Sequence, residues 1–414
     1  MVSLVTGVWL NSSGEPPVDQ WVHAIESWAG TAPLSTGPTE QGERRWSHHN
    51  KGSGFNNPWP SFVDPGGPTI GRKILLRKIK GTENVPDTKA ETVPVRKPVF
   101  LQERQPENES LRVTWLGHAC VFAEFPTGLR VLFDPVFTPR CSPFSFMGPK
   151  RYTEQPCQVD DIPIVDVVVI SHNHFDHLSE PTVKEIAKRH PNAQFFVPLG
   201  LASWFKSTGI PNVTELDWWE SRDYVLGSKA TSQTNGASSG NGAGTQTINA
   251  TFGCLPSQHQ TARSGFDRMS TLWASWSVSS GGKSLWFGGD TGYRTVPEAS
   301  EGKDDYSGEF AHLPVCPAFS QIGQLRGPFD VGLVPIGAYA PRFIFSPIHA
   351  NPEDAVNIMR DVNAKKALGI HWGTWILTEE DVLEPPRLVK AALKKKDMPL
   401  DRFEVCDIGE SVDY

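Results

Sequence analysis

The sequence predicts an α/β or mixed α and β domain over residues 111–414, and two observations lead to this prediction. Short runs rich in Val, Ile, Phe and Trp alternate with turn residues, which is the pattern of buried strands. Two longer stretches have the apolar spacing of amphipathic helices, and each follows such runs. Strands and helices mixed along one chain favour a sheet that is covered by helices.

Turn residues such as Gly, Pro, Ser and Asp bound the predicted strands. These strands lie within residues 111–125, 129–135, 165–171, 193–198, 271–280, 283–292 and 330–338. The predicted helices lie within residues 179–190 and 351–366. They open with Ser179 and Asn351, which are good N-caps, and a proline follows each cap within two positions.

The remaining segments differ in composition. Residues 1–54 are rich in Gly, Pro, Ser and other polar residues without sustained periodicity, so we expect them to be mostly irregular or disordered. Residues 55–110 form an N-terminal extension of the domain. Within the domain we expect two polar insertions, a flexible low-complexity loop at residues 228–247 and a second loop at residues 297–312.

Composition argues against several classes of protein. The net charge of −7 does not suit a nucleic-acid binder, which would normally be basic. The six cysteines form no CxxC pair, so neither a zinc knuckle nor a disulfide scaffold is expected. No apolar run approaches the ~18 residues of a membrane span, and residues 1–17 lack the basic start of a signal peptide. We therefore expect a cytoplasmic protein.

A dense polar cluster follows the strand-like run at residues 167–170. His172, His174, Asp176 and His177 lie within six positions of one another, and each needs a partner once it is buried. Imidazole nitrogen and carboxylate oxygen are ligands that suit Zn²⁺, Mn²⁺ or Fe. One ion rarely takes four ligands from a single short loop, so the pattern indicates ligands divided between two ions.

Two neighbouring ions need further ligands, including a carboxylate between them. Three candidates follow strand-like runs elsewhere in the chain: His259, Asp290 and His371. Taken alone, each is more simply a polar residue that is satisfied by a hydrogen bond at a strand end. The cluster at residues 172–177 strengthens the metal-ligand interpretation of all three.

These motifs resemble the signature of the metallo-β-lactamase superfamily, in which HxHxDH is followed by a histidine, an aspartate and a final histidine. More specific strings resemble the family of N-acyl-phosphatidylethanolamine-hydrolysing phospholipases D. They include VTWLGHA, MGPKRY, ISHNHFDHL, PSQH, GGDTGY, NPEDAV and HWGT. The resemblance covers residues 111–410 apart from the two insertions, and extends weakly to FNNPWPSF near residue 55.

The resemblance implies a four-layer αββα sandwich with two Zn²⁺ at one edge. By motif position, the ligands of one ion would be His172, His174 and His259, those of the other Asp176, His177 and His371, with Asp290 bridging. Asp134 would accept a hydrogen bond from a ligand histidine and so orient it. His118 is either a second such supporting residue or a histidine of the core.

The implied reaction cuts N-acyl-phosphatidylethanolamine into N-acylethanolamine and phosphatidic acid. Two ions lower the pKa of a water so that hydroxide attacks phosphorus, and Asp176, Asp290 and His349 would lie nearest to this chemistry. His349 would either contact substrate or cap the helix that follows it. Two alternatives stay open, because one fold serves many functions. They are a metallo-hydrolase of a soluble lactone or phosphodiester, and a non-catalytic lipid-binding relative.

A phospholipid substrate requires a surface that meets the membrane, so we expect peripheral membrane association. Residues 70–80 carry five cations among apolar residues: Arg72, Lys73, Arg77, Lys78 and Lys80. On a helix, Leu75, Leu76 and Ile79 share one face, and basic residues beside such a face suit anionic lipid. An ordinary amphipathic helix docked on the core is an equally simple interpretation.

Several residues within the matching motifs are candidates for binding the substrate phosphate, although basic residues are also common on any surface. They are Lys150, Arg151, Arg263, Tyr339 and Arg342. Gln260 and residues 264–271 depart from the family pattern, so the resemblance leaves the acyl-chain and headgroup preference open. The resemblance also implies a homodimer, for which the sequence carries no interface signature.

Overall fold

The computed structural model describes residues 6–10, 48–50, 52–64, 66–104, 109–228 and 247–414, and its described strands form two sheets. The eight-stranded sheet has the order β1 (Thr6–Leu10), β8 (Ser221–Ser228), β9 (Thr247–Leu255), β10 (Ser275–Ser280), β11 (Lys283–Phe287), β12 (Phe329–Pro335), β13 (Ala364–Ile370) and β14 (Phe403–Glu404). The seven-stranded sheet has the order β15 (Ser411–Asp413), β2 (Arg112–Trp115), β3 (Val121–Glu124), β4 (Arg130–Phe133), β5 (Val167–Val169), β6 (Gln194–Pro198) and β7 (Val213–Leu216).

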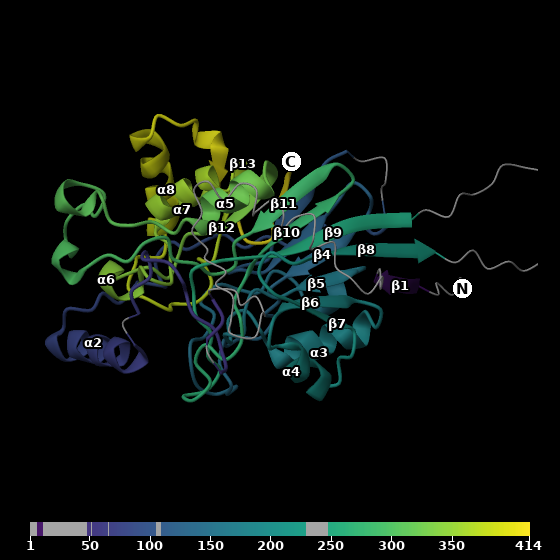
Figure 1. Ribbon diagram of the computed structural model, residues 1–414, viewed down its shortest axis with the longest axis horizontal. Helices are drawn as coiled ribbons and strands as arrows, with labels where there is room; N and C mark the ends of the chain where they lie inside the picture. The colour runs from purple at the N-terminus through teal and green to yellow at the C-terminus, as the bar shows by residue number, and fades with distance from the viewer. Residues whose placement is uncertain (1–5, 11–47, 51, 65, 105–108, 229–246) are drawn as a thin grey trace, which may run out of the picture.

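Helices cover the outer faces of the two sheets. Figure 1 shows α3 (Glu180–Arg189) and α4 (Ala202–Ser207) beside β5, β6 and β7. On the opposite side, α5 (Ala318–Leu325), α7 (Pro352–Asp361) and α8 (Glu384–Lys395) lie beside β10 to β13. Two further helices, α2 (Gly67–Lys80) and α6 (Arg342–Phe345), lie at the end of the molecule away from β1. The four-layer αββα sandwich is thereby confirmed.

Strand β5 shows how the sequence builds these layers. Val167 and Val169 belong to the core between the sheets, whereas Val168 and Ile170 belong to the cluster shared with Val183 of α3. Side chains alternate between the two faces of a strand, so a strand that is covered on both faces must be apolar throughout. The run at residues 167–170 is therefore continuous rather than alternating.

Aromatic side chains fill the space between the sheets. Phe196 of β6 stacks on Phe252 of β9 with ring centroids 4.5 Å apart, and Phe133 of β4 meets Phe287 of β11 at 4.8 Å. Trp115, Trp273, Trp276 and Trp286 are also fully buried. These contacts fix one sheet against the other at the edge where the polar motifs emerge.

The N-terminal part of the chain differs from expectation within the described residues. Thr6–Leu10 forms β1, which pairs antiparallel with β8, so residues 1–54 are not irregular throughout. This pairing extends the edge of the eight-stranded sheet, whose exposed N–H and C=O groups favour an added strand. Residues 1–5, 11–47 and 51 lie outside the described part. Phe55 and Trp59 of the extension lie in the main hydrophobic core.

Two other expectations need adjustment. The helix expected over residues 351–366 ends at Asp361, because Asn363 has the left-handed φ of 58° and Ala364 already begins β13. Most of the expected loop at residues 228–247 lies outside the described residues, between β8 and β9. The expected loop at residues 297–312 contains two short 3-10 turns, Glu298–Ser300 and Gly308–Phe310. Elsewhere in the described residues, Val159–Asp161 and Leu400–Arg402 form similar 3-10 turns.

We predict that Phe252→Ala lowers the free energy of unfolding by about 3–5 kcal/mol, because it opens a cavity between the sheets. Urea denaturation of the purified protein measures this loss. Phe266→Ala is the matched control, since Phe266 is 103% exposed and its removal opens no cavity. Equal stability of the two variants would contradict the assigned packing.

Candidate metal centre

The polar motifs meet at the ends of strands from both sheets. His172, His174, Asp176 and His177 follow β5 in the seven-stranded sheet. His259, Asp290 and His371 follow β9, β11 and β13 in the eight-stranded sheet. Because the ends of parallel strands gather at one edge of a sheet, this is where side chains from distant segments converge.

A tight turn folds the histidine loop back on itself. The N–H groups of His177 and Leu178 both donate to the carbonyl oxygen of His174, at 3.1 and 2.8 Å. This turn directs Asp176 and His177 toward the same space as His172. Arg263 clamps the loop from outside, because its guanidinium donates to the carbonyls of Asn173 and Leu178 at 2.7 and 2.8 Å.

Four residues form the first cluster: His172, His174, His259 and Asp290, whose potential ligand atoms all lie within 4.8 Å of one another. His172 Nε2 is 2.9 Å from His174 Nδ1, which in turn is 3.3 Å from His259 Nε2. The three histidines proposed for one ion therefore converge.

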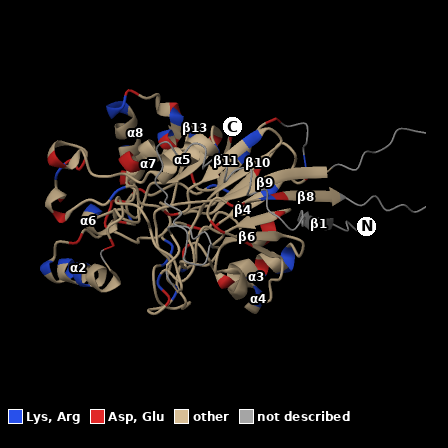
Figure 2. Cartoon of the chain, viewed as in Figure 1, with Lys and Arg blue, Asp and Glu red and all other residues tan. Residues whose placement is uncertain are grey.

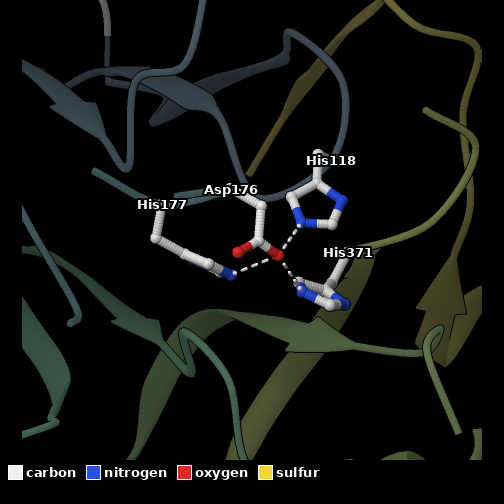
Figure 3. A group of neighbouring side chains, drawn as sticks. All are labelled: His118, Asp176, His177 and His371. Atoms are coloured by element: carbon white, nitrogen blue, oxygen red, sulfur yellow. Dashed lines mark hydrogen bonds and ion pairs between the residues drawn. The ribbon is translucent and has the colours of Figure 1, made fainter. Parts of the chain in front are cut away.

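Asp176, His177, His371 and His118 form the second cluster, shown in Figure 3. Asp176 Oδ2 lies at its centre, 3.0 Å from His118 Nε2, 3.5 Å from His177 Nε2 and 3.6 Å from His371 Nε2. The structure thus places His118 against the Asp176 carboxylate rather than in an apolar part of the core.

Asp290 lies between the two clusters. Its Oδ2 is 3.5 Å from His259 Nε2 and 3.2 Å from His177 Nε2, and its Oδ1 is 2.8 Å from His371 Nε2. The approach depends on Gly289, which has a left-handed φ of 57° and where a Cβ would lie 2.5 Å from Ser171 Cβ. A carboxylate in this position can contact a metal ion on either side.

Hydrogen bonds to the Nδ1 atoms orient several of these histidines. The Asp134 carboxylate lies 2.6 Å from His177 Nδ1 and accepts hydrogen bonds from the N–H and hydroxyl of Ser171 at 2.7 and 2.5 Å. Ser171 Oγ is also 2.8 Å from His172 Nδ1, and the Ile348 carbonyl is 2.9 Å from His259 Nδ1. Such partners select the tautomer that presents Nε2 to a metal.

Two of these supporting groups were not anticipated from the sequence. Ser171 precedes HxHxDH directly, so its place beside the motif was a readable signal. The Ile348 carbonyl belongs to the backbone and carries no signal in the residue type. Asn57 is a third case, because its side-chain amide donates to the carbonyl of His259 at 2.7 Å from a segment 202 residues away.

Buried polar atoms between the clusters fit bound cations. Among the described residues, His177 Nε2, His371 Nε2 and both carboxylate oxygens of Asp290 are buried, and their close contacts with one another lack hydrogen-bond geometry. Leaving such atoms unsatisfied costs about 1–3 kcal/mol each. Burial lowers the pKa of His172 and of His259 well below the usual range, which keeps these imidazoles in the neutral form that binds metals.

Comparison with known proteins decides the family. A beta-lactamase superfamily domain model matches residues 129–372. N-acyl-phosphatidylethanolamine-hydrolyzing phospholipase D 1 of Caenorhabditis elegans is 34% identical over 391 residues, covering 91% of this chain and 97% of that protein. The chain belongs to this family.

Two further relatives are similar over shorter stretches. A mitochondrial N-acyl-phosphatidylethanolamine-hydrolyzing phospholipase D of Saccharomyces cerevisiae is 32% identical over 290 residues, covering 70% of this chain and 53% of that protein. An uncharacterized protein of Mycobacterium tuberculosis is 36% identical over 288 residues, covering 68% and 64%. The chain is therefore a metal-dependent hydrolase of the metallo-β-lactamase superfamily.

His349 lies beside the metal centre and not in a helix cap. Its Nδ1 is 3.9 Å from Asp290 Oδ2, and its ring stacks on His371 with centroids 5.4 Å apart. The cap of α7 is instead Asn351, whose side chain accepts a hydrogen bond from the N–H of Asp354 at 2.8 Å. The structure therefore places His349 beside the metal centre and excludes it as the cap of α7, while contact with substrate stays a prediction.

Most of the expected phosphate-binding residues have structural partners instead. Arg151 donates to the carbonyls of Val136 and Thr138 and lies over the ring of Trp375. Arg263 is occupied by the histidine loop, as described above. Their guanidinium groups are therefore turned toward the protein, which argues against phosphate binding by either residue.

Arg342 and Tyr339 also have partners within the protein. Arg342 is 2.9 Å from Asp305 Oδ2 and 2.8 Å from Asp354 Oδ2, so its charge is already paired. The Tyr339 hydroxyl donates to Glu384 at 2.6 Å. Of the five candidates, Lys150 alone is exposed. Phosphate binding by these residues stays a prediction.

We predict that Asp134→Asn weakens metal retention by about 10–100-fold, because His177 loses the charged acceptor that orients it. Metal content after dialysis against graded chelator concentrations measures the effect. Asp87→Asn, at an exposed position, is the control and should match the unmodified protein. Identical retention by both variants would remove Asp134 from the support of the centre.

Proposed function

We propose that the chain is a zinc-dependent phosphodiesterase of the phospholipase D type, which hydrolyses N-acyl-phosphatidylethanolamine to N-acylethanolamine and phosphatidic acid. The observation that carries this proposal is the pair of clusters with Asp290 between them. The worm and yeast relatives are N-acyl-phosphatidylethanolamine-hydrolyzing phospholipases D, which supports this substrate.

The same geometry supports a division of the ligands between two Zn²⁺. His172, His174 and His259 would hold one ion, while Asp176, His177 and His371 would hold the other, with Asp290 shared. Imidazole nitrogen and carboxylate oxygen form a ligand set that suits zinc. The close pairing within each cluster favours this division over a single ion.

Two bound cations would supply an activated water and neutralise charge on the phosphate oxygens. The residues of the chain position the reacting groups. Asp290 keeps histidines of both clusters directed to one point, and His118 holds the Asp176 carboxylate. Burial lowers the pKa of His349 to about 4, so its imidazole is neutral near pH 7. With its side chain 13% exposed, His349 can contact the substrate or exchange a proton with it.

We predict that the zinc-loaded protein releases N-acylethanolamine and phosphatidic acid from N-acyl-phosphatidylethanolamine, as measured by mass spectrometry of the products. Unmodified phosphatidylethanolamine should stay intact. His172→Ala should lower the rate on the order of 100-fold or more, since the loss of a ligand exceeds the loss of a supporting residue. His312→Ala, at an exposed histidine, is the control and should keep the rate.

Two other outcomes would replace this proposal. Cleavage of a soluble phosphodiester or lactone, with no cleavage of either lipid, would support the same metal chemistry on a different substrate. Absence of any hydrolysis together with lipid binding would support a non-catalytic relative. A homodimer, expected from the resemblance, stays a prediction that analytical ultracentrifugation can test.

Helix α2 supports peripheral membrane association. Ile74, Leu75, Leu76 and Ile79 are exposed, and no residue of this helix is buried, so its apolar face is not docked on the core. Figure 2 shows basic residues along α2, which lies at the periphery of the molecule. In the described part of the chain, no helix has the length and apolar character to cross a bilayer.

Two of the five expected lipid-binding cations are turned toward the protein. Arg77 is 2.8 Å from Glu379 and also pairs with Glu301, whereas Lys73 is 3.1 Å from Glu298. These ion pairs attach α2 to the domain and remove both charges from the outer surface. Arg72, Lys78 and Lys80 are exposed and form the basic group that we propose for lipid contact.

We predict that changing Arg72, Lys78 and Lys80 together to Gln weakens binding to anionic liposomes by about 100-fold, at about 1 kcal/mol per lost cation. Co-sedimentation with liposomes measures the partition. The control changes Arg387, Lys390 and Lys394 to Gln, which removes the same charge from the exposed face of helix α8. Equal sedimentation of the two triple variants would exclude α2 as the contact.

A further inference from the structure

A second group of histidines lies in the N-terminal segment, outside the metal centre. His48 and His49 precede a tight turn in which His49 pairs with Phe55 as an antiparallel bridge. The N–H of Asn56 donates to the His48 carbonyl at 2.8 Å and closes the turn. The turn holds both imidazoles on one side, with ring centroids 4.5 Å apart.

Asp217 meets both histidines from the end of β7. Its Oδ1 is 2.7 Å from His48 Nε2, and its Oδ2 is 2.7 Å from His49 Nε2. The N–H of Trp218 donates to the same Oδ1 at 2.7 Å and orients the carboxylate. His48 is further fixed by stacking on the Trp218 ring, with centroids 4.2 Å apart.

We propose that His48, His49 and Asp217 form a further divalent-cation site, suited to Zn²⁺ or a similar transition metal. Their potential ligand atoms lie within 4.8 Å of one another, and two imidazoles with one carboxylate form a known zinc ligand set. The three side chains are 3%, 27% and 11% exposed, so the site is formed inside the protein yet remains open to a water ligand.

The local charge favours a cation. With both imidazoles neutral, the Asp217 carboxylate gives the site one negative charge. The Glu220 carboxylate lies next to it, because its Oε2 accepts a hydrogen bond from the Asp217 N–H at 3.0 Å. A cation bound by the three residues would be stabilised by both carboxylates.

The spacing of the ligand atoms is compatible with metal binding. An ion with ligands at 2.0–2.2 Å in a tetrahedral arrangement separates neighbouring ligand atoms by about 3.3 Å. The distances of 2.7 Å must therefore widen by a small rotation of the Asp217 side chain. The metal centre shows comparable compression, since His172 Nε2 and His174 Nδ1 are 2.9 Å apart.

An ion at this site would anchor a segment that supports the metal centre. The same segment continues to Asn57, which donates to the His259 carbonyl at 2.7 Å, and to Ser61, which donates to the Gln258 side chain at 2.6 Å. Tying His48 and His49 to Asp217 fixes this segment on the end of β7. The proposed ion is therefore structural and lies outside the reacting groups.

The test is a zinc titration of the full-length protein after chelator treatment and dialysis, with elemental analysis of the bound metal. We expect His49→Gln and Asp217→Asn each to bind one Zn²⁺ fewer per chain than the unmodified protein. His312→Gln, which removes an exposed histidine elsewhere, should bind the full amount. Equal zinc content in all four proteins would overturn the proposal and leave a hydrogen-bonded histidine–aspartate group.

A second measurement needs no variant and therefore avoids any loss of folding. Diethyl pyrocarbonate modifies accessible histidines, and mass spectrometry locates the modified positions. We expect Zn²⁺ to protect His49 from modification while His312 reacts equally with and without the ion. Equal labelling of His49 in both conditions would contradict the site. Neither measurement depends on lipid hydrolysis, so each can fail or succeed independently of the proposed function.

Discussion

The carboxylate of Asp290, buried among imidazoles, is the interaction on which the arrangement of the site depends. It is near His259, His177 and His371 at once, and those residues come from three different strand ends. Burial alone would raise the pKa of Asp290, but its close contacts with the imidazoles of His177 and His371 hold that pKa well below its usual range. An ionised carboxylate in this position requires cationic partners, and bound metal ions are the natural ones.

The sequence predicted those parts of the site and of the fold that a short local pattern encodes. HxHxDH after an apolar run located the histidine loop, and the strands β4, β5, β6, β10 and β11 fell within the predicted runs. The orientation of long side chains could not be predicted from such local patterns. Arg151, Arg263 and Arg342 lie in family motifs, yet each guanidinium is directed by backbone carbonyls or carboxylates that are distant in the sequence. The residue type shows that the side chain carries a positive charge, but only the fold shows where the guanidinium group points.

The N-terminal part of the chain contributes more to the structure than its composition indicates. Thr6–Leu10 completes an edge of one sheet, and Asn57 supports the backbone of His259. Asn57 and His259 are 202 residues apart in the sequence, so no local pattern could have revealed their contact. Low periodicity led us to expect an irregular path before residue 55, and the irregular segment at residues 52–64 is nonetheless tightly bonded to the core.

The division of the polar motifs between two sheets has a consequence for how the protein is made. One sheet provides the histidine loop with Asp134, and the other provides His259, Asp290 and His371. A newly synthesised chain offers only the four residues at positions 172–177 as a local group, and the complete set exists only after the sheets have packed together. Metal binding would then be a late step in folding. Ions bound by residues of both sheets would hold the two packed sheets together.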